Sequence, residues 1–387
     1  MGITGIIAEY NPFHLGHAYQ LSKARDFSDR IIVIMSGDVV QRGEFAILDK
    51  WKRTELALRS GADLVMELSP VFSLSSANLF AEGAVMTLSS LGMINDLFFG
   101  TEDDIEVLNE VTDILMKKEP SLDMLIKENL EQGKSYPRAQ YEAFLSLYGK
   151  RYAEVLEKPN NILGIEYIKA IRRYADGITP VALKRTSSHD SVTENGFASG
   201  LAVREMIRNK DASWKQYVPE GMDGLYEGPV FTEDCFTLLI SRLRAPGALE
   251  ALRDTPDVSE GIENKIVKAS YEASDFDDLL KRIKSKRYPL SRIKRILLSF
   301  LIGIKRDDIS DILLAKPVVR ILGIRKDSTD LLSMLSSDPS VKLVTNLSGT
   351  DIPRDTELSI QASNIRGLLC NPPKRHNSDF YQRFITV

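Results

Sequence analysis

The first half of the chain alternates short apolar runs with stretches of helical period. The apolar runs are rich in Ile, Val, Leu or Phe and are bounded by Gly, Asn, Ser or Asp, at residues 3–9, 30–35, 63–68, 96–99 and 178–184. The helical stretches between them cover residues 17–28, 50–60, 77–91 and 161–174. Continuous apolar strands that alternate with helices predict an α/β fold, in which helices wrap a parallel sheet. Ligands of such sheets bind at the carboxyl ends of the strands, so the residues after each strand are the first candidates for a site.

The same patterns divide the rest of the chain. A helical insertion over residues 102–157 interrupts the alternation, and a stretch at 219–229 with Pro and Gly has the composition of a linker. We therefore expect a sheet domain over residues 1–218, a helical domain over 219–308 and a small α/β subdomain over 309–387. The helices expected after the linker are 231–244, 261–272, 275–284 and 291–304, and the later short elements are 317–324, 327–335 and 341–345.

The composition is that of an ordinary globular protein, with 43% hydrophobic residues, 27% charged residues and a formal net charge of −4. The two cysteines, Cys235 and Cys370, cannot make a disulfide framework, and no Cys or His stands beside them at metal-ligand spacing. The sequence shows no leader pattern and no run of the roughly 20 apolar residues that a membrane span needs. We expect a soluble, cytoplasmic protein with no structural metal and no membrane partner.

Residues 5–17 read GIIAEYNPFHLGH and carry the strongest chemical signal. The apolar strand ends, an Asn-Pro pair turns the chain, and a helix begins near Gly16. The imidazoles of His14 and His17 stand three residues apart at the start of this helix and project toward the same space. Amides at a helix N-terminus favour an anion, and Gly16 would let a nucleotide approach the backbone. Imidazole N–H donors would then stabilise the charge that develops on the α-phosphate of ATP, so both histidines are candidate catalytic residues.

An alternative is that His14 and His17 are only surface polar residues of a first helix. The chain has four histidines, and two of them stand here, directly after the first expected strand. A nucleotide site is expected at that position of a doubly wound sheet, which favours the catalytic interpretation.

Five segments in order carry a resemblance to a known family. They are EYNPFHLGH at 9–17, Met35-Ser36-Gly37 followed by Gln41-Arg42-Gly43, Phe99-Gly100-Thr101-Glu102, Lys158-Pro159-Asn160-Asn161-Ile162-Leu163-Gly164, and Ile283-Lys284-Ser285-Lys286-Arg287-Tyr288. The first is similar to the HIGH-type motif of the nucleotidylyl transferase superfamily. Together the five resemble the bacterial tRNA(Met) cytidine acetate ligase family over nearly the whole chain. The resemblance implies a Rossmann-like parallel sheet with a HIGH-type nucleotide site, a helical domain and a small C-terminal α/β subdomain.

The resemblance also implies an activity. Members of the family activate acetate with ATP as acetyl-adenylate and acetylate N4 of the wobble cytidine of elongator tRNA(Met), and we expect Mg2+ to accompany the ATP. Further ATP contacts map to Gly100, to one of Asn160 and Asn161, and to Arg185. The segment that holds ATP in the family corresponds here to Ile7, Ala8, Glu9, Tyr10, Asn11, Pro12, Phe13, His14, Leu15, Gly16, His17, Ala18, Tyr19 and Gln20.

For each of the further positions, a simpler role is an alternative to contact with ATP. Asn161 opens a helix and could only cap it. Arg185 follows a strand and can neutralise phosphate, or it is a solvated charge. Ser199 and Arg204 are placed like the second Ser-x-x-x-x-Arg phosphate segment of nucleotidylyl transferases, from which Gly200 departs, so a role without a ligand is an equal alternative for them.

The segment after the second strand adds candidates for acetate and metal. Arg42 could bind the carboxylate of acetate. Asp38 could help to hold magnesium on the triphosphate, although a lone Asp in a loop is usually a turn residue. Lys50 and Arg53 are expected on the solvated face of the next helix.

Residues 281–295 read KRIKSKRYPLSRIKR, with eight cations, no acid and one tyrosine. This density predicts a surface for the phosphate backbone of RNA. A merely solvated face is the alternative, which the lack of interleaved Glu or Asp disfavours. After Pro289, Arg292 and Arg295 fall outside the apolar stripe of a helix and are expected to face solvent or RNA. The expected tRNA contacts are Lys281, Arg282, Lys284, Lys286, Arg287, Arg292 and Arg295.

The leading interpretation is thus an ATP-dependent ligase that acts on tRNA. One alternative is a cofactor-forming adenylyltransferase with a small phosphate-containing acceptor, which would not need the helical second half. Another is a non-catalytic RNA-binding protein on the same fold, against which the intact His14, Gly16 and His17 argue.

Overall fold

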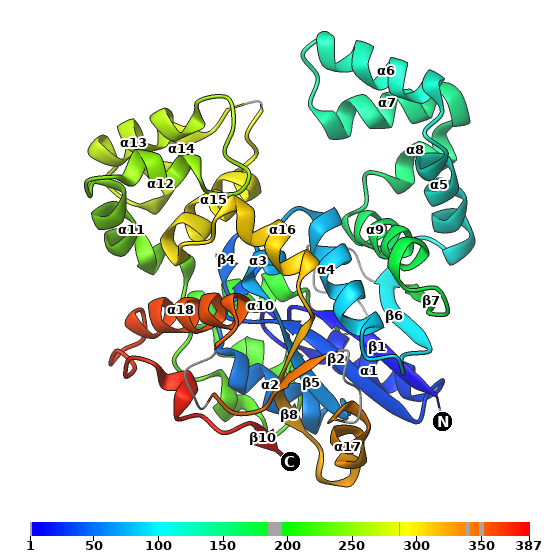
Figure 1. The fold of residues 1–387 in the computed structure, drawn as a ribbon, viewed down its shortest axis with the longest axis vertical. Helices are drawn as coiled ribbons and strands as arrows, with labels where there is room; N and C mark the ends of the chain where they lie inside the picture. Colours follow the sequence, from blue (N-terminus) through cyan, green and yellow to red (C-terminus); the bar gives the residue numbers. More distant parts are fainter. Residues whose placement is uncertain (1, 185–195, 286, 337–340, 348–351) are drawn as a thin grey trace.

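A computed structural model of the protein describes residues 2–184, 196–285, 287–336, 341–347 and 352–387. Its centre is an eight-stranded sheet with the strand order β10-β8-β5-β2-β1-β6-β7, in which β9 also pairs with β8 (Figure 1). The strands are β1 (Ile3–Ala8), β2 (Arg30–Ser36), β5 (Leu64–Leu68), β6 (Asp96–Thr101), β7 (Thr179–Lys184), β8 (Val318–Ile324), β9 (Lys342–Val344) and β10 (Ile385–Thr386). The five runs expected as strands in the first half all pair in parallel, and the α/β fold is confirmed.

Helices cover both faces of the sheet. They are α1 (Leu15–Arg25), α2 (Lys50–Arg59), α3 (Pro70–Ser73), α4 (Ala77–Ser89), α9 (Pro159–Tyr174) and α10 (Gly200–Arg208). On β2, Ile32 and Ile34 pack in the core that α4 and α9 cover. Ile31 and Val33 point to the other face, where α1, α2 and α10 pack. Because both faces are buried, every residue of the strand between Arg30 and Ser36 is apolar, which is why the strand appears in the sequence as an unbroken run.

Two groups of helices stand on either side of the carboxyl edge of the sheet (Figure 1). One is the expected insertion, with α5 (Ile105–Lys117), α6 (Pro120–Glu131), α7 (Tyr136–Tyr148) and α8 (Lys150–Val155). The other has a core of its own and contains α11 (Phe236–Leu243), α12 (Ala248–Arg253), α13 (Ile262–Glu272), α14 (Phe276–Ile283) and α15 (Leu290–Ile302). Short connections complete the chain, namely β3 (Val39–Val40), β4 (Glu44–Phe45) and the 3-10 turns η1 (Ala212–Tyr217), η2 (Asp223–Tyr226), η3 (Thr232–Cys235), η4 (Lys326–Ser328) and η5 (Ser378–Phe380).

The C-terminal segment differs from the separate subdomain expected for residues 309–387. Its strand β8 pairs with β5 in antiparallel orientation and so extends the N-terminal sheet. The helices of the segment are α16 (Arg306–Leu314), α17 (Asp330–Ser336) and α18 (Arg354–Leu368), and α18 contributes Leu358, Ala362 and Ile365 to the core of the second helical group. The reason is that β5 is buried and apolar, so its outer edge needs a partner strand. Residues 309–387 therefore join the sheet to the helical group.

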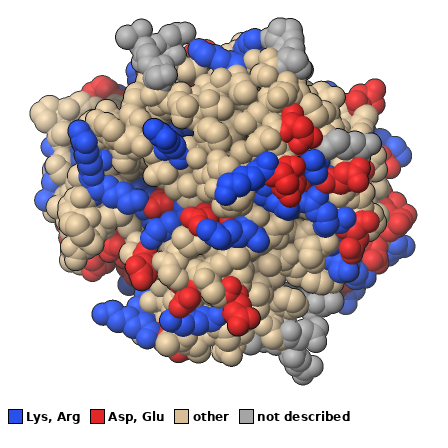
Figure 2. Space-filling view, turned by 90° about the horizontal axis from the view of Figure 1, so that it is seen from below, with Lys and Arg blue, Asp and Glu red and all other residues tan. Residues whose placement is uncertain are grey.

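Charges of both signs are interspersed at the surface. Figure 2 views the molecule from below as it stands in Figure 1, the end where β10 and α17 lie, and Lys and Arg alternate there with Asp and Glu. This distribution agrees with the small net charge of −4. In the part of the chain that the structure describes, no helix is both long and apolar enough to cross a bilayer.

Candidate active site

A cavity of about 410 Å3 lies at the carboxyl edge of the sheet, where β1 and β6 end. Its walls come from these strand ends, from the starts of α1, α9 and α10, and from the segment after β2. The sequence-predicted residues that line it are Ile7, Ala8, Glu9, Tyr10, Asn11, His14, His17, Gln20, Arg42, Gly100, Asn160, Ser199 and Arg204. Segments far apart in the sequence thus meet where a parallel sheet is expected to bind its ligand.

His14 and His17 form a stacked pair in the wall of this cavity. His14 is the N-cap of α1, and its Nδ1 accepts a hydrogen bond from the N–H of Gly16 at 3.0 Å. Nδ1 of His17 accepts from the backbone N–H of His14 at 3.3 Å, and the ring centroids lie 3.8 Å apart. Because Nδ1 is an acceptor in both rings, each neutral imidazole carries its proton on Nε2. Both histidines can therefore donate a hydrogen bond to a ligand oxygen.

Gly16, which stands between the two histidines, leaves room for the His14 ring because it has no side chain. A Cβ at Gly16 would lie 2.8 Å from Cε1 of His14, closer than real contacts allow. Gly16 itself does not line the cavity. The direction in which a side chain at position 16 would project is thus occupied by the His14 ring.

Ser199 and Arg204 bring a second helix N-terminus to the same wall. The Ser199 side chain caps α10 and accepts a hydrogen bond from the N–H of Ala202 at 3.1 Å. Arg204 donates to the carbonyl oxygen of Asn11, in the turn that precedes α1. A Cβ at Gly200 would lie 3.3 Å from that same carbonyl oxygen, so the departure from the usual motif accompanies a close approach of two backbones. The guanidinium of Arg204 therefore stands beside the histidine pair.

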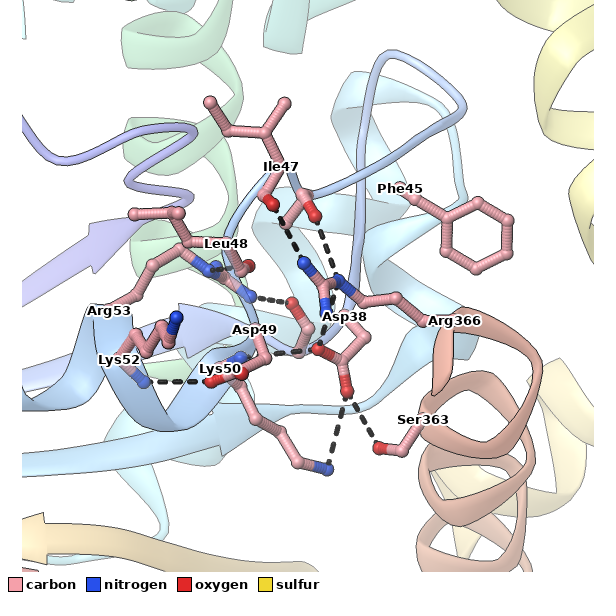
Figure 3. A network of polar contacts seen from close by, with 12 residues as sticks. Asp38, Phe45, Ile47, Leu48, Asp49, Lys50, Lys52, Arg53, Ser363 and Arg366 are labelled. Carbon is pink, nitrogen blue, oxygen red and sulfur yellow. Dashed lines mark hydrogen bonds and ion pairs between the residues drawn. The ribbon is translucent and has the colours of Figure 1, made fainter. Parts of the chain in front are cut away.

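The segment between β2 and α2 is held in place by two buried guanidinium groups (Figure 3). Arg53 of α2 donates to the carbonyl oxygens of Glu9, Ser36, Gly37 and Leu48. Arg366 of α18 reaches the same segment and donates to the carbonyl oxygens of Ala46 at 3.0 Å and Ile47 at 2.7 Å. These bonds fix the chain on both sides of Arg42, which lines the cavity.

The segment around α2 holds three charged residues whose surroundings differ from those expected from the sequence, namely Asp38, Lys50 and Arg53. Lys50 and Arg53 were expected on a solvated face, but both are fully buried. Lys50 Nζ lies 2.9 Å from Glu67 and 2.7 Å from Asp379. Although burial acts to raise it, the charges of Lys50 and its neighbour Arg320 bring the pKa of Asp379 down to about 2. The expectation of a solvated face is wrong. The acids that allow Lys50 to be buried come from distant elements, so the local pattern of the helix does not indicate them.

Asp38 belongs to the same buried network and not to an open loop. Its Oδ1 accepts from the backbone N–H of Lys50 at 3.2 Å, and its Oδ2 accepts from the hydroxyl of Ser363 at 2.7 Å (Figure 3). A carboxylate bound in this way is unsuited to hold magnesium. Among the residues with described positions, no group of three or more His, Cys, Asp or Glu side chains could hold a metal ion.

The two asparagines at the start of α9 have different surroundings. Asn161 is fully buried, and its Oδ1 accepts from the backbone N–H groups of Glu102 at 2.9 Å and Asp103 at 3.2 Å. It therefore secures the turn after β6, and the helix cap is Lys158 instead. Asn160 lines the cavity, and its Nδ2 donates to Oε1 of Glu102 at 2.6 Å. Of the two, Asn160 is the one in reach of a ligand.

Part of the expected ATP segment points away from the cavity. Pro12, Phe13, Leu15, Gly16, Ala18 and Tyr19 do not line it. Phe13 is instead a buried core residue that packs on Tyr10, with ring centroids 4.8 Å apart. Leu15, Ala18 and Tyr19 do not line the cavity because a helix presents only one side to it. Arg185 and Lys286 lie outside the described residues.

An apolar wall was missed by sequence reasoning. The apolar residues that line the cavity without having been named as site residues are Val40, Ala77, Phe80, Phe99, Pro159, Ile162, Leu163, Tyr167 and Leu201. Phe99 and Tyr167 meet edge to face with centroids 5.4 Å apart. The spacing of the apolar wall residues on β6 and α9 is that of core residues, so only the motif segments at 99–102 and 158–164 gave a signal.

The basic run at 281–295 is more strongly paired than its composition indicates. Arg282 lies 2.6 Å from Glu272 and 2.9 Å from Asp278. Arg287 lies 3.0 Å from Glu260. The acids that the run lacks are thus supplied by residues outside it, from α14 itself and from other segments of the helical group.

The expectation of outward orientation is wrong for Arg295. This residue is 9% exposed and lies 3.4 Å from Asp257. The helix α15 is enclosed on several sides, so the position outside the apolar stripe is buried too. Arg292 is half-buried and donates to the carbonyl oxygen of Asp257 at 2.8 Å, whereas Lys281 and Lys284 are exposed.

Comparisons with known proteins agree with this geometry. The model of the HIGH Nucleotidyl Transferase family matches residues 1–381. The tRNA(Met) cytidine acetate ligase of Clostridium perfringens is 34% identical over 395 residues, which cover 98% of each chain. The protein of the same name from Acetivibrio thermocellus is 34% identical over 100% of each chain. The chain belongs to this ligase family.

Solved structures of the family show the same fold. Thermotoga maritima TmcAL bound with alpha-thio ATP superposes with a TM-score of 0.87 at 30% identity, over 100% of each chain. The apo form of that protein gives a TM-score of 0.88 at 31% identity. The resemblance inferred from the five motif segments is therefore confirmed. Four of these segments contribute wall residues to the cavity, and the fifth lies in the basic run of the helical group.

Proposed function

We propose that the protein activates acetate with ATP as acetyl-adenylate and then acetylates N4 of the wobble cytidine of elongator tRNA(Met). The observation that carries this proposal is the stacked pair of His14 and His17 in the cavity wall. Family members of nearly the same length are named for this ligase activity, and one was solved with an ATP analogue. These names support the choice of ATP, acetate and tRNA(Met) as substrates.

In the first step, a carboxylate oxygen of acetate attacks the α-phosphorus of ATP and pyrophosphate leaves. The Nε2–H groups of His14 and His17 would donate to the phosphate oxygens that gain charge. Arg204, beside them, would add a positive charge. Mg2+, when bound, would screen the outer phosphates and would be held largely by phosphate oxygens and water, as is usual for this ion.

The remaining walls suit the other parts of these substrates. The backbone of Gly100 and the side chain of Asn160 would contact the adenosine, against the apolar wall that includes Phe99. Arg42, on the fixed segment after β2, would pair with the carboxylate of acetate. Its position on the cavity wall supports this assignment.

The RNA would lie along the helical group beside the cavity. The exposed cations Lys281 and Lys284 would contact the phosphate backbone, and Arg282, Arg287 and Arg292 would join them by exchanging a protein partner for a phosphate. Lys286, in the basic run, is proposed as a further RNA contact because of the density of cations there. Arg185 is proposed as an ATP contact on the basis of the family resemblance.

The proposal is tested with purified protein, ATP, radiolabelled acetate and total bacterial tRNA. Label is expected in RNA with the wild type, and about 10²–10³-fold more slowly with His17→Ala, which loses one donor to the phosphate. Digestion of the RNA to nucleosides should place the label on cytidine. Acetate-dependent exchange of pyrophosphate into ATP reports the first step separately.

Other outcomes would identify the alternatives. Pyrophosphate release with a small phosphate-containing acceptor, and no label in RNA, would overturn the ligase and indicate an adenylyltransferase. Salt-sensitive RNA binding without any ATP turnover would indicate a non-catalytic RNA-binding protein.

A further inference from the structure

Glu9 places a fixed carboxylate in the wall of the nucleotide cavity. Its Oε1 accepts a hydrogen bond from the backbone N–H of Gln41 at 2.7 Å. Its own carbonyl oxygen is held by Arg53 at 2.6 Å, so both ends of the residue are anchored. Within the described part of the chain, Oε2 accepts no hydrogen bond. One oxygen therefore orients the group, and the other is available to a ligand.

A second carboxyl group on the same wall, that of Glu44, has a pKa shifted in the opposite direction from that of Glu9. Glu44 lies 2.8 Å from Lys294 of α15. Although burial acts to raise it, Lys294 holds the pKa of Glu44 below its usual value. Burial raises the pKa of Glu9, and the amide of Gln41 with the charges of Arg42 and Arg204 only partly opposes this effect. Neighbouring carboxyl groups whose pKa values move apart are typical of groups that differ in acid–base role.

The second step of the proposed reaction needs a proton acceptor. The N4 amine attacks the carbonyl carbon of acetyl-adenylate, the N–C bond forms, and the C–O bond to the phosphate breaks as AMP leaves with the electron pair. The nitrogen must then lose one proton. The amine of cytidine is a weak nucleophile because its lone pair is shared with the ring, so removal of this proton during attack accelerates transfer.

The other ionisable groups that line the cavity within the described part of the chain are unsuited to this task. His14 and His17 use Nδ1 as an acceptor within the protein and present Nε2–H donors. Arg42 and Arg204 are cations, and Glu44 is occupied by Lys294. Burial raises the pKa of the Tyr10 hydroxyl to far above neutrality, and that of Tyr167 likewise.

We propose that Glu9 is the general base that accepts the N4 proton of the attacking cytidine. The inference rests on the proposed function and assigns Glu9 to its second step alone. The first step needs no proton transfer, because acetate attacks as a carboxylate. Glu9 is thus required for transfer to RNA and not for formation of acetyl-adenylate.

The test is Glu9→Gln, which keeps the shape of the side chain and the acceptor for the Gln41 amide. Acetate-dependent pyrophosphate exchange measures the first step. Single-turnover transfer of radiolabelled acetyl from preformed acetyl-adenylate to tRNA measures the second. We expect transfer to slow by about 10²-fold or more, and by at least about 10-fold more than exchange.

A pH profile of the single-turnover rate adds a second readout. In the wild type the rate should fall as the pH decreases through the pKa of Glu9, above the usual value for a glutamate, because the base becomes protonated. The charged and titratable groups that face Glu9 are Arg42, Arg204, Glu44 and Tyr167. In Glu9→Gln this fall should disappear, and in Glu9→Asp it should remain.

Three results would overturn the inference. Equal losses of exchange and transfer in Glu9→Gln would assign Glu9 to ATP binding. Unchanged transfer would deny it any role in the second step. Absence of acetate-dependent exchange in the wild type would overturn the proposed function itself, and is distinguishable because it does not involve the variant.

Discussion

The guanidinium of Arg53 donates a hydrogen bond to the carbonyl oxygen of Glu9 at 2.6 Å, across 44 positions of the sequence. The same group also serves the carbonyl oxygens that end β2. A fully buried cation is normally costly, but backbone carbonyls surround this one. The bond links the first turn of α2 to the strand end that carries the nucleotide site, so the site depends on a residue that contacts no substrate.

Replacing Arg53 by Met should therefore destabilise the fold. The variant leaves several buried carbonyls without a donor, at a cost of about 3–5 kcal/mol in the free energy of unfolding. Urea unfolding followed by far-UV circular dichroism measures this cost. Arg59→Met removes a half-exposed cation from the same helix and should cost about 0.5 kcal/mol or less. Equal costs for the two variants would contradict the role assigned to Arg53.

Gly16→Ala should disturb the histidine pair without removing either imidazole. The new methyl group would meet Cε1 of His14 at 2.8 Å, so the ring must move. A displacement of about 1 Å can slow a reaction by about 10²-fold, and this loss is expected in acetate-dependent pyrophosphate exchange. The control Gly224→Ala adds a methyl group in open space and should exchange at the wild-type rate. Wild-type exchange by Gly16→Ala would show that the ring position is not critical.

Replacing the buried carboxyl of Asp355 should stabilise the protein in a pH-dependent way. Burial raises the pKa of this carboxyl to about 6 in the folded protein, against about 4 for an unfolded chain. The folded state therefore binds the proton more tightly, and stability is lost as the pH rises from about 4 to about 6. Asp355→Asn removes this penalty and should stabilise the protein by about 1–2 kcal/mol at pH 7.5, with little effect at pH 4.

The measurement for Asp355→Asn is the urea midpoint at both pH values. The exposed Asp123 provides a matched control, because Asp123→Asn should change the free energy of unfolding by about 0.5 kcal/mol or less at each pH. A gain of equal size at both pH values would mean that the effect is unrelated to protonation.

Reversal of two exposed charges should weaken RNA binding alone. In the double variant Lys281→Glu and Lys284→Glu, the slope of log K against log salt concentration for tRNA should decrease by about 2, because two phosphate contacts are lost. Pyrophosphate exchange should remain at the wild-type rate. Lys326→Glu should leave both properties unchanged. The backbone N–H of Lys326 bonds the carbonyl oxygen of Val387, directly after β10, and β10 lies at the end of the molecule opposite the helical group (Figure 1). An unchanged salt slope in the double variant would place the RNA elsewhere.

Local sequence patterns were sufficient for the five parallel strands of the first half, for the first-half helices and for the meeting of the two histidines. The strands of the first half are continuous apolar runs because both faces of the sheet are buried, and that requirement is visible in the sequence. His14 and His17 stand at a strand end and a helix start, so their meeting follows from local geometry. The helical insertion could also be predicted, because its helices carry their own apolar stripes.

Only the tertiary structure decided which charged residues are buried. Lys50 and Arg53 follow the polar pattern of a helix surface, and the acids that neutralise Lys50 come from β5 and from the turn at Asp379. Arg295 and Arg282 likewise find acids outside the basic run. The pairing of β8 with β5 was decided in the same way. Local periodicity records the secondary structure of a segment and its apolar side, whereas the neutralisation of a charge and the partner of a strand edge depend on segments far away in the sequence.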